Sequence, residues 1–147
     1  MSSILFLLSL FSAVNNLFVA PPLTFELRME NLEQASGAIW VAFYDQPDTF
    51  LKDEGIVNQV VQRVSATPVQ TIEIDGVTPG IYAIAVFHDL NDNKVLDKNA
   101  LGVPTEPYAF SRDCRQKLRA PRFEEARFTL NQENTKMTFT LRRWKDM

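Results

Sequence analysis

The chain has 147 residues, of which 46% are hydrophobic and 22% are charged, and its formal net charge at pH 7 is −3. This is the composition of an ordinary globular protein, and the length predicts one domain whose core needs no disulfide. The acidic balance argues against a nucleic-acid-binding protein. The single cysteine, Cys114, excludes an intramolecular disulfide. We expect it to be a small buried or half-buried side chain and not a catalytic nucleophile, because no clear general base stands near it in the sequence.

The chain opens with an apolar segment that carries no charged side chain before Glu26. Its apolar core, residues 4–14, has the length of a signal-peptide core and is too short to span a bilayer. The segment departs from a typical export signal in two ways: no basic residue precedes the core, and Pro21 follows Ala20, the natural last residue of a cleaved leader. We predict that residues 1–20 are a signal peptide or hydrophobic leader of a periplasmic or secreted protein without a stable membrane span. A retained anchor and a buried N-terminal helix are the alternatives.

From residue 23 onward the hydrophobic pattern predicts strands. Residues 23–29 alternate between apolar and polar side chains, which is typical of a half-buried strand, and residues 69–77 do the same. Residues 37–45 and 81–89 are apolar on both faces and predict two central strands. Residues 49–64 fit either a loop with a short strand or a helical turn.

Two further alternating segments, residues 126–130 and 137–141, flank the polar turn 131–134 and predict a hairpin. The total is six or seven strands with no long helix. We therefore predict an all-β fold, an antiparallel Ig-like β-sandwich of about seven strands, formed by a single domain over residues 23–143.

A long segment, residues 89–123, lies between the strands predicted at residues 81–89 and 126–130. Loops of this length are uncommon in compact domains and are usually functional or held in place by other groups. The segment opens with Asp89, Asn91, Asn93 and Asp97 at odd-numbered steps, which is the start of a calcium-loop pattern. Calcium takes about six to eight hard oxygen ligands, and short Asp and Asn side chains in a tight loop can converge on one ion.

The pattern is not that of an EF-hand. Lys94 stands where the sharp turn normally needs glycine, Ala100 stands where a bidentate glutamate is normal, and the flanks predict strand and loop. We predict a calcium loop of another type, with ligands from Asp89, Asn91, Asn93, the carbonyl of Val95, Asp97 and Glu106. The alternative is a metal-free turn in which the Asp and Asn side chains accept backbone N–H groups.

His88, the only histidine, precedes this loop and shares a strand face with Tyr82, Ile84 and Val86. A hydrogen-bonded structural histidine is the favoured interpretation. A hydrolase in which His88 acts as general base, oriented by Asp89 or Glu106, is the alternative, although no nucleophile elbow is present and Ser111 is only a nominal nucleophile. A basic cluster follows and predicts either a solvated loop face or a surface for an anionic partner or lipid: Arg112, Arg115, Lys117, Arg119 and Arg122.

Three segments, "GVTPGIYAIAVFHDLNDNKVLD", "LGVPTEPYAFS" and "APRFEEARFTL", occur in this order. Together they resemble the bacterial domain-of-unknown-function family 2141, over roughly residues 24–143. The family pattern is matched at Phe87, His88, Asp89, Asn91, Asn93, Asp97, Gly102, Pro104, Glu106, Phe110, Ser111, Pro121, Phe123 and Ala126. Lys94 replaces its usual glycine. The resemblance implies an exported single-domain protein, similar to transthyretin-like and carboxypeptidase-regulatory-like sandwiches, which are usually accessory or binding modules.

Together these observations predict a non-catalytic binding or accessory module with a calcium-stabilised Asp/Asn loop. We expect its binding surface at His88, Tyr108, Phe110 and Ser111, and its partner to be a protein or a small ligand. A purely structural domain with a metal-free loop is the remaining alternative.

Overall fold

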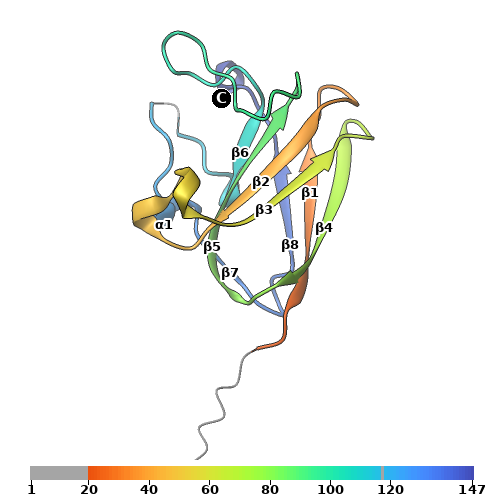
Figure 1. The fold of residues 1–147 in the computed structure, drawn as a ribbon, viewed down its shortest axis with the longest axis vertical. Coiled ribbons are helices and arrows are strands. Elements are labelled where there is room, and N and C mark those ends of the chain that lie inside the picture. Colours follow the sequence, from red (N-terminus) through yellow and green to blue (C-terminus); the bar gives the residue numbers. More distant parts are fainter. Residues whose placement is uncertain (1–19, 117) are drawn as a thin grey trace, which may run out of the picture.

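The computed structural model describes residues 20–116 and 118–147 and shows a mostly β protein (Figure 1). The predicted leader lies outside the described residues, apart from Ala20. The strands are β1 (Leu23–Glu30), β2 (Ala38–Tyr44), β3 (Ile56–Arg63), β4 (Val69–Val77), β5 (Gly80–Asp89), β6 (Tyr108–Phe110), β7 (Phe128–Leu130) and β8 (Lys136–Thr140). The helices are α1 (Phe123–Ala126) and the 3-10 turns η1 (Pro47–Thr49), η2 (Asp53–Gly55), η3 (Ser111–Asp113) and η4 (Trp144–Asp146).

The prediction of a β-rich fold is confirmed, but the described residues form eight strands and not about seven. The short strand β6 lies inside the segment that was expected to be one long loop. The ambiguous residues 49–64 form η2 and then β3. Among the described residues, no helix has both the length and the apolar character needed to cross a membrane.

The strands form two sheets. One has the order β4-β1-β8, and the other has the order β3-β2-β5-β6, with β7 also paired to β5. All of these pairs are antiparallel except β1 with β8, which is parallel. The expectation of a wholly antiparallel arrangement is therefore wrong for this one pair, in which β8 runs in the same direction as β1.

The predicted hairpin of the last two strands is also wrong. The turn is present, closed by an isolated bridge between Asn131 and Asn134, but the two strands enter different sheets. β7 pairs with the beginning of β5, and β8 pairs with β1. This split gives an edge of β1 and the first part of β5 a hydrogen-bonding partner, which a hairpin paired only to itself would not supply.

One hydrophobic core lies between the two sheets. The alternating residues Phe25, Leu27 and Met29 of β1 are fully buried and contact inward residues of β2 and β5. Each such side chain contributes about 1.5–3 kcal/mol when it is buried completely. The outer face of β2 and β5 carries a second, smaller cluster, in which the rings of Tyr44 and Phe123 both pack against Phe50. This second cluster explains why both strands are apolar on two faces.

The chain after β5 forms a loop at one end of the sheets, whereas β7 lies at the other end (Figure 1). The loop leaves the C-terminal end of β5, and β7 pairs with the N-terminal end of the same strand. We call residues 89–107, which connect β5 to β6, the Asp/Asn loop.

Candidate functional site

The Asp/Asn loop begins at Asp89, the last residue of β5, whose side chain is fully buried. Its Oδ1 accepts the N–H of Asn93 at 3.1 Å, and its Oδ2 accepts the N–H of Lys94 at 2.8 Å. Hydrogen bonds to an ionised group are the stronger kind, so this carboxylate fixes the turn. Asp92 and Lys94 have φ values of 61° and 70°, so Lys94 adopts the left-handed conformation that glycine usually supplies in such loops.

The next three predicted ligands form a network around one carboxylate. Asn91 Nδ2 donates to Asp97 Oδ2 at 2.7 Å, and Asn93 Nδ2 donates to Asp97 Oδ1 at 2.9 Å. The amide oxygen of Asn91 accepts the N–H of Asn93, and the amide oxygen of Asn93 accepts the N–H of Val95. Since Asn93 also donates its N–H to Asp89, the four predicted side chains belong to one hydrogen-bonded cluster.

Glu106 closes the loop from its far end. It is 4% exposed, and its two carboxylate oxygens accept the N–H of Leu90 at 2.8 Å and the N–H of Asp97 at 3.1 Å. The backbone of Asp97 is held a second time, because its carbonyl oxygen accepts the N–H of Thr105 at 2.8 Å. Glu106 therefore holds the backbone of the loop, and both of its oxygens face N–H groups.

Several residues that the sequence did not single out also hold the loop. The side-chain oxygen of Asn99 accepts the N–H groups of Leu101 and Val103 and forms a second Asx turn. The sequence signal for this turn was the asparagine itself. Gln34 Nε2 donates to the carbonyl of Leu90, and Arg143 Nη1 donates to the carbonyl of Thr105. These two come from distant parts of the chain, so no local pattern could have identified them.

His88 is fully buried and faces the interior of the protein. Its Nε2 lies 2.8 Å from the carbonyl oxygen of Ser36, so Nε2–H is the donor, and its backbone N–H donates to Pro107. Within the described residues, Nδ1 is buried without a hydrogen-bonding partner. This placement is that of a structural histidine, and no hydrogen bond links its ring to Asp89 or Glu106 in the described part of the chain.

The family comparison agrees with the sequence motifs. The model of an uncharacterised protein family conserved in bacteria, DUF2141, matches residues 27–138 of the chain. The chain belongs to DUF2141. No curated protein and no solved structure matches it.

In this DUF2141 chain, the predicted binding surface is only partly at the surface. His88 and Ser111 are fully buried, and the Ser111 hydroxyl is occupied because Oγ accepts the N–H of Ile84 and donates to the carbonyl of Ala126. A buried side chain with two partners cannot contribute to a docking face. Tyr108 and Phe110 are half-buried and pack edge to face with ring centroids 5.7 Å apart. Burial raises the pKa of the Tyr108 hydroxyl.

Two arginines of the basic cluster of the DUF2141 chain pair with local carboxylates. Arg119 forms a two-pronged ion pair with Glu125, and this contact, with the hydrogen bond from the backbone N–H of Arg122, lowers the pKa of Glu125 to about 2. Arg115 pairs with Asp113. Cys114 is half-buried, as expected, and burial raises the pKa of its thiol, which opposes formation of a thiolate nucleophile. Lys117 lies outside the described residues.

The fit of the loop to a metal ion depends on its oxygen atoms. Among the described residues, no group of three or more His, Cys, Asp or Glu side chains could hold a metal ion. The carboxylate of Asp97 faces the amide nitrogens of Asn91 and Asn93, whose own oxygens accept backbone N–H groups. Asp89 and Glu106 each direct both oxygens to backbone N–H groups, so their first role is to shape the loop.

Proposed function

We propose that this protein is an exported, non-catalytic binding or accessory module, an Ig-like or transthyretin-like sandwich whose Asp/Asn loop binds Ca²⁺. The observation that carries the calcium proposal is the convergence of Asn91 and Asn93 on the carboxylate of Asp97, with Asp89 joined to the same network. The partner of the module would be a protein or a small ligand that contacts the surface beside the loop.

The chemistry of the loop supports a weak calcium site. Asp97 offers a carboxylate at a half-buried position, and Asn91 and Asn93 are exposed, so an ion can reach all three from solvent. The amide groups now direct nitrogen to Asp97, and binding requires that they turn so that their oxygens face it. This rotation of the amide groups breaks the hydrogen bonds that their oxygens accept from the N–H groups of Asn93 and Val95. We therefore expect a dissociation constant of about 10⁻⁴–10⁻³ M, as in extracellular calcium modules.

A metal-free structural loop is the second candidate, and a specific observation favours it. All four oxygens of Asp89 and Glu106 accept backbone N–H groups, and both oxygens of Asp97 accept amide N–H groups. A loop whose polar groups are paired in this way needs no ion to be ordered. The two candidates make opposite predictions for the effect of calcium on stability.

The test is thermal melting of the full chain in 10 mM CaCl₂, in 10 mM MgCl₂ and in chelator. At about 10–100 times the dissociation constant, calcium should add about 1.4–2.7 kcal/mol to the free energy of unfolding, which is a rise of several degrees in Tm. Asp97→Ala should abolish the rise. Asp92→Ala is the matched control, because Asp92 lies in the same loop but pairs with Arg63. An equal Tm in calcium and in chelator would establish the metal-free loop instead.

The non-catalytic part of the proposal rests on the burial of the residues that an enzyme would use. A general base must reach the proton that it removes, and His88 has no exposed surface and donates Nε2–H to Ser36. The expected result is no turnover of ester, phosphoester or peptide substrates above the blank. A hydrolase activity that is lost in His88→Gln, with Tm unchanged, would show that the protein is an enzyme and not a binding module.

Export is tested by the mass of the protein after expression from the full sequence in a bacterium. Cleavage after Ala20 would leave a periplasmic or secreted chain that begins at Pro21. Pro21 and Pro22 are exposed and precede β1, so this cleavage would leave the strands intact. An uncleaved chain in the cytoplasm would contradict this part of the proposal, and an uncleaved chain in the membrane fraction would indicate an anchor.

A further inference from the structure

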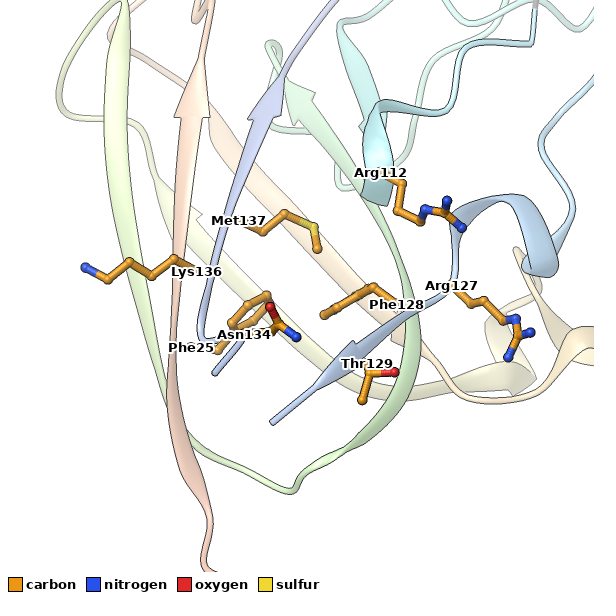
Figure 2. A pocket seen from close by; sticks show the side chains of 8 residues that line it. All are labelled: Phe25, Arg112, Arg127, Phe128, Thr129, Asn134, Lys136 and Met137. Atoms are coloured by element: carbon orange, nitrogen blue, oxygen red, sulfur yellow. The ribbon is translucent and has the colours of Figure 1, made fainter. Parts of the chain in front are cut away.

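A cavity of about 310 Å³ lies between β7 and β8 (Figure 2), at the end of the protein opposite the Asp/Asn loop (Figure 1). Its lining residues are Phe25, Arg112, Arg127, Phe128, Thr129, Asn134, Lys136 and Met137. The volume is at the lower end of the range of about 300–1,000 Å³ that is usual for small-molecule sites.

The cavity exists because the last two strands separate. β7 joins the sheet of β5, and β8 joins the sheet of β1, so the strands diverge from their shared turn and do not fill the space between the sheets. The apolar part of the lining is continuous with the core: the rings of Phe25 and Phe128 stack with centroids 5.7 Å apart. Met137 points toward Phe128 from the opposite strand (Figure 2). Phe25, Phe128 and Met137 thus form an apolar part of the lining, beside the polar and basic side chains of the rest.

The charged part of the lining is entirely basic. Arg127 forms an ion pair with Glu124, and Lys136 forms one with Glu26, so these two cations are partly neutralised. Arg112 has no carboxylate partner among the described residues, and no acidic side chain lines the cavity. In a chain with net charge −3, this is a local excess of positive charge. Charge complementarity favours an anionic occupant whose charged group meets Arg112.

The backbone places Arg112 at the cavity at a conformational cost. Arg112 has φ 62° and ψ 19°, and Asp113 also has a positive φ, so two consecutive residues that are not glycine adopt the left-handed conformation. Ser111 holds this turn, because its buried hydroxyl bonds to Ile84 in β5 and to Ala126 at the end of α1. Unfavourable backbone conformations kept in place by surrounding contacts are typical of ligand-binding positions.

We propose that this cavity binds a small amphipathic carboxylate, a molecule with one carboxylate and an unbranched hydrocarbon tail. The guanidinium of Arg112 pairs with the carboxylate, for which its planar fork is suited. The tail packs against Phe128 and Met137. This inference is independent of the calcium proposal, because the cavity and the Asp/Asn loop share no residue and lie at opposite ends of the sheets.

The test is calorimetric titration of the full chain with octanoate, with 1-octanol as the uncharged match and acetate as the match for the charged group alone. We expect octanoate to bind, and 1-octanol and acetate to bind at least tenfold more weakly. Arg112→Gln should weaken octanoate binding by tenfold or more. Arg28→Gln is the matched control and should change it less than twofold, since Arg28 is exposed on β1 and pairs with Glu30.

A second variant, Met137→Glu, places a carboxylate inside the cavity and should abolish octanoate binding with the fold retained, because Met137 is only half-buried. Equal affinity for octanoate and 1-octanol would overturn the role of Arg112. Binding of octanoate that neither Arg112→Gln nor Met137→Glu weakens would place the ligand elsewhere. Failure of octanoate to bind the well-folded chain at millimolar concentration would overturn the proposal as a whole.

Discussion

Replacement of Glu106 by alanine would remove the acceptor of two backbone N–H groups at once. The Glu106 side chain is 4% exposed, and its oxygens lie 2.8 Å from the nitrogen of Leu90 and 3.1 Å from that of Asp97. A buried donor left without a partner costs about 1–3 kcal/mol. Leu90 and Asp97 are themselves only half-buried, so water can reach part of the space. We therefore expect a loss of about 2–4 kcal/mol in the free energy of unfolding.

For a domain of this size, such a loss corresponds to a fall in Tm of about 6–16 °C. The measurement is thermal and denaturant unfolding of Glu106→Ala beside Glu54→Ala, an exposed glutamate in η2 whose removal should cost less than about 0.5 kcal/mol. In Glu106→Ala, hydrogen exchange should be faster at the amides of Leu90 and Asp97, and the increase there should be larger than at other amides. Equal stability of the two variants, with unchanged exchange at both amides, would refute the role assigned to Glu106.

Two further perturbations test other parts of the structure. Gly37→Ala should cost about 2 kcal/mol more than Gly102→Ala in denaturant unfolding: both glycines have φ 77°, but only at Gly37 would the new Cβ lie 2.1 Å from the carbonyl oxygen of Asp89. The ion pair with Arg119 lowers the pKa of Glu125 from its unfolded value of about 4.3 to about 2, so its stabilising effect is complete above pH 4.3 and is lost as the pH falls to 2. Glu125→Gln should flatten the dependence of Tm on pH in this window, and an unchanged slope would contradict it.

The hydrophobic pattern was sufficient to predict most strands, because successive side chains of a strand point to opposite faces and only the face toward the core must be apolar. Phe25, Leu27 and Met29 are buried as their spacing predicts, and the two segments that were apolar on both faces are the neighbouring strands β2 and β5. Strand pairing is another matter, since it depends on which edges are open. The turn at 131–134 was identified, but nothing local in the sequence indicates that β7 and β8 enter different sheets.

At the Asp/Asn loop, the sequence predicted which side chains come together but not what each of them does. Asp89, Asn91, Asn93 and Asp97 form one network, as their spacing indicated. The geometry of Glu106 could not be predicted, because its two N–H partners are separated along the chain and meet only through the closure of the loop. The burial of His88 and Ser111 likewise depends on contacts with distant backbone groups.

The distribution of polar partners gives the two ends of the protein different physical characters. At the Asp/Asn loop, the carboxylates of Asp89 and Glu106 are buried and paired with backbone N–H groups, so ordering of this end is achieved by the chain itself. An ion there must compete with existing hydrogen bonds, which limits its affinity. At the other end, Arg112 has no carboxylate partner among the described residues and lines a cavity that also has an apolar part. A ligand there forms an ion pair with Arg112 without first breaking another ion pair. We therefore expect the cavity to bind its ligand more tightly than the loop binds calcium.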